Sequence, residues 1–232
     1  IKERGGVEVT GIEANPGAAQ VSKGRLDRVI VTDLDSLDSL PLPPRYFDCI
    51  VCADVLEHLL DPERVLSVML RYLKPEGSVV ISIPNIRNSD ILTDLLVKGR
   101  WQYQPAGILD ATHLRFFTLH EIRELLDRLG LQAEGMQASV SPENPALDAM
   151  ANVVQQLGGD RERFLQESRV IQYIFRARPV PASRPPAVTE PRHQNAPATV
   201  DDVQRDLQLR KKRVALIYED ALRRDTPGEY CR

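Results

Sequence analysis

Short runs rich in β-branched residues, three of which end in an acidic residue, alternate with helix-like runs along most of this chain. Segments 7–13 (VEVTGIE), 29–33 (VIVTD), 47–54 (FDCIVCAD) and 78–84 (SVVISIP) have the composition of short buried strands. Strands that alternate with helices assemble into a mainly parallel sheet with helices on both faces. The sequence therefore predicts an α/β domain.

The helical runs between these strands have recognisable boundaries. An apolar helical pattern covers 55–73, where Pro62 is tolerated in a first turn, and the turn sequence 74–77 (KPEG) ends it. A second helix is predicted over 118–129, with Thr118 as its N-cap. Glu121 completes a capping box there, Gly130 ends the helix, and two candidate final strands follow, 131–140 and 170–177.

The composition changes after residue 178. Six of the 17 prolines lie within the next 20 residues, which is typical of an extended linker. Segment 200–224 then carries apolar residues at 4-3-4-3 spacing after two aspartates, which predicts one amphipathic helix that associates with a partner. We expect a domain over 1–178, a proline-rich linker over 179–199, and a helix and tail over 200–232.

Charge and composition exclude several classes of protein. The 232 residues have a net charge of −3 over 63 charged side chains, so no global field would attract nucleic acid. No apolar run is long enough for a membrane span and no signal sequence is recognisable, so we expect a cytoplasmic protein. Three cysteines are too few for a disulfide framework, which agrees with that compartment.

Acidic residues at strand ends are the first candidates for function, because ligands of such sheets bind beyond the carboxyl ends of the strands. Glu13 ends the first visible strand, where a carboxylate can accept two hydrogen bonds from the hydroxyls of a ribose. Asp33 and Leu34 follow the second strand and could contact an adenine ring. The alternatives are a solvated loop acid at Glu13 and a turn-forming aspartate at Asp33.

The run 48–58 (DCIVCADVLEH) contains a second group of candidates. Cys49 and Cys52 are three apart on a strand and point to opposite faces, so a redox or metal pair is not expected. Asp54, Glu57 and His58 cluster where the strand passes into a helix, which suits a general base or a divalent cation. The alternative is that Glu57 and His58 only hold the loop.

Four motifs together, in order and spacing, resemble class I S-adenosylmethionine-dependent methyltransferases over residues 1 to about 178. These are Glu13 after a strand, Asp33-Leu34, the run 47–58, and the run 73–77 (LKPEG) before a strand. The resemblance implies a Rossmann-like sheet with S-adenosylmethionine as cofactor. It implies that Glu13 binds the ribose and that Asp33 and Leu34 bind the adenine. Ala53 and Asp54 would line the methionine side.

The resemblance also implies a strand that precedes residue 1. Members of the family begin with a central strand and a Gly-x-Gly-x-Gly turn, and the sequence shows neither before segment 7–13. The family order 3-2-1-4-5-7-6 places that strand between segments 7–13 and 47–54. We therefore expect an N-terminally incomplete sheet in which these two segments each lack a neighbour.

A third group of candidates lies between segment 78–84 and the helix at 118–129. Family members carry acceptor-side residues there, and aromatic and charged side chains suit a sugar or another polar acceptor. His113 is the first candidate for a general base and His58 the second. The candidate acceptor-binding residues are Trp101, Tyr103, Asp110 and Arg115. The alternative for the two aromatic residues is packing against an edge.

The sequence therefore predicts methyl transfer to a small-molecule, glycan or nucleotide-sugar acceptor, mainly on oxygen, without a bound metal. The resemblance is to methyltransferases found beside or fused to glycosyltransferases. An NAD(P)-dependent Rossmann enzyme is one alternative, but it would require a Tyr-x-x-x-Lys pair or its equivalent, which the chain lacks. A non-catalytic scaffold that associates through 200–224 is another.

Overall fold

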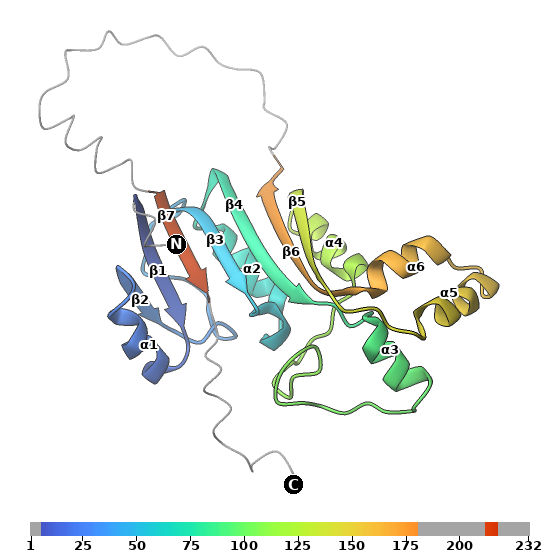
Figure 1. Cartoon of the computed structure of the whole chain (residues 1–232). Coiled ribbons are helices and arrows are strands. Elements are labelled where there is room, and N and C mark those ends of the chain that lie inside the picture. Colours follow the sequence, from blue (N-terminus) through green and yellow to red (C-terminus); the bar gives the residue numbers. More distant parts are fainter. Residues whose placement is uncertain (1–5, 181–211, 218–232) are drawn as a thin grey trace, which may run out of the picture.

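A computed structural model describes residues 6–180 and 212–217. Seven strands form one sheet in the order β2-β1-β7-β3-β4-β6-β5 (Figure 1). The strands are β1 (Val7–Glu13), β2 (Arg28–Val31), β3 (Phe47–Ala53), β4 (Leu73–Pro84), β5 (Leu131–Val140), β6 (Val170–Pro179) and β7 (Lys212–Ile217). The α/β architecture predicted from the sequence is confirmed.

Six α-helices connect or flank these strands. They are α1 (Pro16–Lys23), α2 (Pro62–Leu70), α3 (Ser89–Leu96), α4 (Leu119–Arg128), α5 (Leu147–Gln156) and α6 (Arg161–Ser168). N-cap side chains accept backbone hydrogen bonds at the starts of α1, α2, α3 and α6, and Asn15 shows the pattern, because its amide oxygen accepts from the backbone N–H groups of Gly17 and Ala18. Within the described residues, none of the helices combines the length and the apolar character that a bilayer-crossing segment requires.

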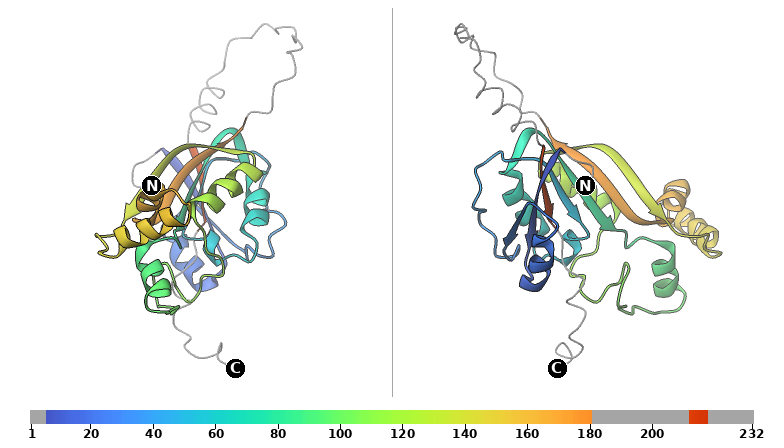
Figure 2. Two further views of the ribbon diagram at one scale, coloured as in Figure 1. Left: turned by 90° about the vertical axis from the view of Figure 1, so that its right-hand side faces the viewer. Right: turned by 60° about the vertical axis from the view of Figure 1, so that its left-hand side comes forward.

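The centre of the sheet contains a strand from the C-terminal part of the chain. β7 pairs in parallel with β1 on one side and with β3 on the other, as Figure 2 shows from two further directions. The expectation of one helix over 200–224 is wrong for 212–217, and the remainder of that segment lies outside the described residues. The expectation that β1 and β3 each lack a neighbour is wrong too, because β7 occupies the position between them.

Two properties of β7 explain why it is a strand. Four consecutive apolar residues, Val214 to Ile217, suit a position with neighbours on both edges, where Ala215 and Ile217 are completely buried. Polar contacts fix its start, since the Arg213 backbone N–H donates to Asp48 Oδ2 at 2.8 Å. The Arg213 guanidinium lies 4.4 Å from the centre of the Tyr46 ring, and its Nε lies 3.5 Å from Glu8 Oε2.

The other half of the sheet is antiparallel. β6 pairs antiparallel with both β4 and β5, so the sheet is mixed rather than parallel throughout. The β1-α1-β2 and β3-α2-β4 crossovers run in opposite directions along the sheet, so right-handed connections place α1 and α2 on opposite faces. On the face opposite α2, Val51 and Val80 remain half-buried. The expectation of helices over both faces is therefore only partly met among the described residues.

Local predictions agree with the structure where short-range rules decide. β1 and β5 match segments 7–13 and 131–140, and the Thr118 backbone N–H donates to Glu121 Oε2 at 2.9 Å as a capping box requires. The turn expected at 74–77 is instead the first part of β4, next to an irregularity in its pairing with β3.

Candidate functional site

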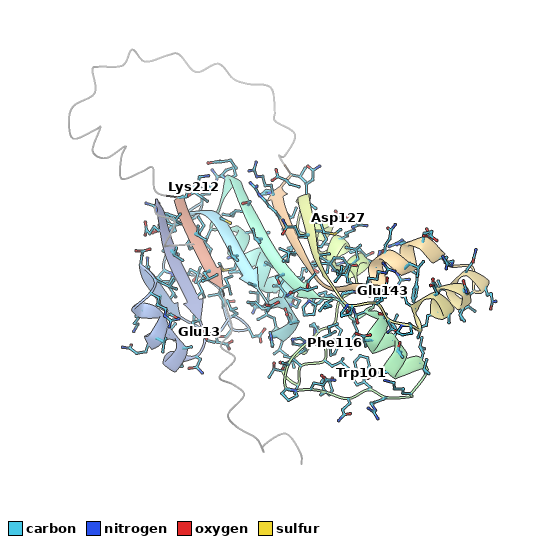
Figure 3. The ribbon with its side chains drawn as sticks, viewed as in Figure 1. Glu13, Trp101, Phe116, Asp127, Glu143 and Lys212 are labelled. Atoms are coloured by element: carbon cyan, nitrogen blue, oxygen red, sulfur yellow. The ribbon has the colours of Figure 1, made fainter. Side chains whose placement is uncertain are left out.

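The registers of four neighbouring strands align the candidate acids along one edge of the sheet. Glu13 is paired with Val31 of β2, Ile12 with Ile217 of β7, and Ile217 with Cys52 of β3. The carboxyl ends of β2, β1, β7 and β3 are therefore level. Glu13 and Asp54 are separated by one intervening strand, which is about 10 Å. Figure 3 shows Glu13 at this edge and Lys212 at the opposite end of the sheet.

Glu13 is the most deeply buried of these acids, with 1% of its surface exposed. Its Oε1 accepts from the backbone N–H of Asn15 at 2.7 Å, and Asn15 caps α1. The carboxylate is therefore held by the loop that joins β1 to α1. A rigid carboxylate at this position suits a ligand that donates two hydrogen bonds, such as a ribose diol.

Asp33 and Leu34 lie two and three residues beyond the end of β2. Asp33 is exposed, and its Oδ1 accepts from the backbone N–H of Asp35 at 3.1 Å, the bond of an Asx turn. The Leu34 side chain is buried in the main core. Arg64 of α2 donates to the carbonyl oxygens of Leu37 at 2.8 Å and Leu34 at 3.2 Å, so α2 shapes this loop. Asp33 can form this turn and also contact a ligand.

Ala53 and Asp54 form the end of β3, where the backbone changes direction sharply. Asp54 has φ of 53°, the left-handed region that few non-glycine residues adopt. Its Oδ1 accepts from Ser82 Oγ of β4 at 3.1 Å and also from Gln172 Nε2 of β6. The next two strands of the sheet, β4 and β6, therefore hold the carboxylate where β3 ends. Sequence reasoning missed Ser82 and Gln172.

A 3₁₀ turn, Leu56–His58, follows the end of β3. Hydrogen bonds attach the loop that precedes α4 to this turn. The Glu57 carbonyl oxygen accepts from the backbone N–H groups of Leu114 at 2.8 Å and Arg115 at 2.9 Å. The two candidate bases are therefore adjacent: the ring centroids of His58 and His113 lie 4.8 Å apart. Their proximity was not predicted, because 55 positions separate them.

Hydrogen bonds indicate which nitrogen of each ring carries a proton. His113 Nδ1 lies 2.9 Å from the Ile108 carbonyl oxygen, and His58 Nδ1 lies 3.3 Å from the Thr112 carbonyl oxygen. A carbonyl oxygen only accepts, so Nδ1 is the donor in both rings. In the neutral ring of His113, Nε2 therefore keeps its lone pair, which presets His113 as a proton acceptor.

The electrostatic environment of His113 favours that neutral form. Burial lowers the pKa of His113 below its ordinary value of 6.5, and the neighbouring His58 lowers it further, whereas the hydrogen bond to Ile108 opposes the shift. The neutral ring is therefore the predominant form at pH 7. A buried imidazole of this kind is suited to remove a proton from an acceptor.

Glu57, His58 and His113 form a cluster of possible metal ligands, of which the sequence predicted Glu57 and His58. One donor atom each from Glu57, His58 and His113 lies within 4.8 Å of the others. Carboxylate and imidazole donors suit a transition metal better than magnesium. Asp54, which the sequence groups with Glu57 and His58, instead bonds to Ser82 and Gln172. The structure therefore supplies His113 as the third member of this group.

The aromatic candidates surround Phe116. Trp101 and Tyr103 have ring centroids 5.5 and 6.4 Å from that of Phe116, and His113 lies 6.4 Å from it. Trp101 and Tyr103 are 41% and 50% exposed, which leaves much of each ring open to a ligand. Both rings therefore pack against Phe116, and their contact with an acceptor stays a prediction. Figure 3 shows Trp101 and Phe116 together.

Asp110 and Arg115 make contacts within the protein. Asp110 Oδ1 accepts from Thr112 Oγ1 at 2.7 Å, and Thr112 Oγ1 lies 3.1 Å from His58 Nδ1. Asp110 therefore orients His58 through Thr112. The Arg115 guanidinium donates to the carbonyl oxygens of Leu114 at 2.9 Å and Leu60 at 2.6 Å. Acceptor contact for these two residues stays a prediction.

Cys49 and Cys52 behave as expected of structural thiols. Cys52 is buried, whereas Cys49 is half-buried and lies 3.7 Å from Ser78 Oγ. Burial raises the pKa of Cys52 to about 12, so its thiol stays protonated at neutral pH. The cysteines therefore contribute packing rather than redox chemistry.

Known proteins share sequence similarity with this chain. Residues 1–134 match a family model described as a methyltransferase domain. Among curated proteins, the chain is 31% identical over 119 residues to a ubiquinone biosynthesis O-methyltransferase of Alkalilimnicola ehrlichii, covering 44% of this chain and 46% of that protein. A mitochondrial protein of the same name from Schizosaccharomyces pombe is 35% identical over 109 residues, covering 44% and 39%.

The chain thus spans less than half the length of these two curated relatives. Solved structures also match, among them a SAM-dependent methyltransferase from Archaeoglobus fulgidus. That likeness has a TM-score of 0.48 at 19% identity and covers 75% of this chain and 77% of that one.

Proposed function

Because the chain belongs to the family of methyltransferase domains, we propose that it transfers a methyl group from S-adenosylmethionine to a small hydroxylated acceptor. The observation that carries this proposal is the common edge on which β2, β1, β7 and β3 end. Acids at that edge suit an adenosyl group, and the two histidines lie at the end of β3.

The residues present fit the cofactor in their donor types. Glu13 would hold the ribose, Asp33 and the backbone of Leu34 the adenine, and Ala53 with Asp54 the methionine end. The buried, hydrogen-bonded Glu13 carboxylate fits the first role, and Ser82 and Gln172 hold Asp54 in position for the last. The cofactor supplies an electrophilic methyl group on a sulfonium.

The remaining chemistry belongs to this chain. His113 Nε2 removes the proton from the acceptor hydroxyl as the oxygen–methyl bond forms and the sulfur–methyl bond breaks. The Ile108 carbonyl holds the ring in the required tautomer. His58, oriented by Thr112 and Asp110, is the second base. Trp101 and Tyr103 would stack on the acceptor, and Arg115 would border it.

A sugar hydroxyl is the acceptor group that we propose, because exposed aromatic rings stack on sugar rings. A glycan acceptor agrees with the 41% and 50% exposure of Trp101 and Tyr103. The relatives' printed names point instead to a quinone precursor. A phenol would stack on the same rings, so the acceptor panel must include both classes.

The grouping of Glu57, His58 and His113 favours a second version of the same function. A divalent cation held by these three residues would lower the pKa of an acceptor hydroxyl by acting as a Lewis acid. In the version without a metal, His113 acts as the base and binds no cation. Chelation should therefore leave the rate unchanged in the first version and abolish activity in the second.

The experiment supplies the full chain with S-adenosylmethionine labelled in its methyl group and a panel of monosaccharides and phenols. We expect label to appear in an acceptor, and this transfer to fall in a His113→Gln variant. Labelled product with no dependence on His113 would exclude the proposed base. No product with any acceptor, together with binding of NADH, would overturn the function in favour of the dehydrogenase alternative.

A further inference from the structure

A cavity of about 620 Å³ lies between α3, the loop 104–109 and the segment 141–145 that follows β5. Ile108 is part of its wall, and the carbonyl oxygen of Ile108 receives the Nδ1 proton of His113. His113 does not line the cavity itself, but it is one hydrogen bond away from a residue of the wall. Its volume is within the range of small-molecule sites and accommodates a sugar-sized group.

The wall of this cavity carries an excess of negative charge. Three carboxylates line it, those of Asp90, Asp94 and Glu143, against a single ammonium, that of Lys98. Lys98 Nζ lies 2.6 Å from Asp94 Oδ1, and the hydrogen bond from Lys98 lowers the pKa of Asp94, with nearby Arg100 adding to the effect. Asp94 is thereby compensated, which leaves the charges of Asp90 and Glu143.

The polar donors of the wall are used within the wall itself. Asn144 Nδ2 donates to Asp90 Oδ1 at 2.8 Å and to Thr93 Oγ1 at 3.1 Å. Asn88 Nδ2 donates to Ser141 Oγ at 2.9 Å. The side-chain N–H groups of Asn144 and Asn88 are thus engaged within the protein. Carboxylate oxygens of Asp90 and Glu143 are among the groups that the wall can still offer a ligand.

Glu143 is the clearest of these acceptors. Within residues 6–180 and 212–217, its carboxylate makes no hydrogen bond or ion pair, and the side chain is exposed. Asp90 is exposed too and engages Asn144 through Oδ1. Two carboxylates that line a cavity attract positive charge and repel anions.

We propose that this cavity recognises a protonated amine carried by the methyl acceptor. The proposal rests on the proposed function and narrows its acceptor class to amine-bearing hydroxylated molecules, such as amino sugars. The same charges disfavour a phosphorylated acceptor. A nucleotide sugar, one of the acceptors expected from the sequence, would place its pyrophosphate against Asp90 or Glu143.

Binding of three matched sugars to the full chain tests this. Glucosamine carries an ammonium group, N-acetylglucosamine is neutral, and glucose 6-phosphate is anionic. We expect ligand-observed NMR titration to rank their affinities in that order. Equal affinity for the three, tighter binding of glucose 6-phosphate, or no binding of glucosamine would each overturn the proposal.

Substitutions in the cavity wall give a second test, because two should weaken glucosamine binding and one should strengthen it. Glu143→Gln and Asp90→Asn should each weaken glucosamine binding about threefold to tenfold, and Lys98→Met should strengthen it about threefold. Glu76→Gln, an exposed acid at the start of β4, is the matched control and should change nothing. An unchanged affinity in all three wall variants would place the bound sugar elsewhere.

A parallel titration with S-adenosylhomocysteine separates this proposal from the function on which it rests. Failure of the cofactor analogue to bind, with glucosamine binding intact, overturns methyl transfer and leaves a cation-binding cavity. Cofactor binding without glucosamine binding overturns the amine proposal alone.

Discussion

The imidazole rings of His58 and His113 lie with their centroids 4.8 Å apart and their planes at 76°, although the two residues come from separate loops. His113 donates its Nδ1 proton to the Ile108 carbonyl oxygen, which leaves its Nε2 as a proton acceptor, and His58 Nδ1 lies 3.3 Å from the Thr112 carbonyl oxygen. These two histidines are the general bases that we propose for methyl transfer.

Replacement of His113 by glutamine should lower the rate of methyl transfer about 100-fold to 10,000-fold, the usual contribution of a general base. Cofactor affinity should stay unchanged, because Glu13 and Asp54 hold that ligand in the proposal. Initial rates under saturating cofactor measure this. A His120→Gln variant, an exposed histidine on α4, is the control and should keep full activity.

The pH profile should show an acid limb that lies below pH 6.5. Burial lowers the pKa of His113, so the base is neutral at pH 7 and gains a proton only as the pH falls through that lowered value. Rate should therefore be independent of pH near neutrality and decline on acidification. An acid limb centred above pH 6.5 would contradict His113 as the base.

Loss of the Thr112 hydroxyl should weaken the orientation of His58 without removing a base. Thr112→Val keeps the side chain's shape but breaks the contacts of Oγ1 with Asp110 Oδ1 and His58 Nδ1. We expect a decrease in kcat of about tenfold or less with little change in KM. Thr112→Ser should restore the rate, since it retains the hydroxyl. A larger loss in Thr112→Val than in His113→Gln would reverse the assigned roles.

Chelation distinguishes the free base from a metal-assisted version. With His113 as a free base, treatment with EDTA should leave the rate unchanged. Added zinc should then inhibit, because ligation by Glu57, His58 and His113 would occupy the lone pair that the base needs. Loss of activity on chelation, restored by one divalent metal, would favour the metal-assisted version instead.

β7 should be essential to the stability of the sheet. Ala215 is completely buried between β1 and β3, so Ala215→Asp places an uncompensated charge there and should destabilise the fold by about 3 kcal/mol or more. Lys212→Gln, at the exposed start of β7, is the control. Chemical denaturation followed by circular dichroism measures both. Equal midpoints for wild type and Ala215→Asp would show that β7 does not hold the sheet together.

Short-range features of the fold were predictable from the sequence. β1 was predicted with its observed ends, because its apolar run stops at an acid and a turn. The capping box at Thr118 and the positive φ of Gly130 follow from residue type alone. These features depend on neighbours within a few positions.

Long-range features could not be predicted in the same way. The run Val214–Ile217 satisfies helical spacing and also the composition of a buried strand, and only the position between β1 and β3 decides between them. Gln172 reaches Asp54 because β6 is antiparallel to β4, a pairing that spans much of the chain. The cavity at Asp90 and Glu143 likewise depends on where separate loops meet.

The most direct test is calorimetric titration of the full chain with S-adenosylhomocysteine, compared between wild type, Glu13→Gln and the control Glu76→Gln. We expect a micromolar dissociation constant for wild type and the control, and about tenfold weaker binding in Glu13→Gln through loss of a charge-assisted bond to the ribose. An absence of binding to wild type, or equal affinity in all three proteins, would contradict the assignment of this edge to an adenosyl group.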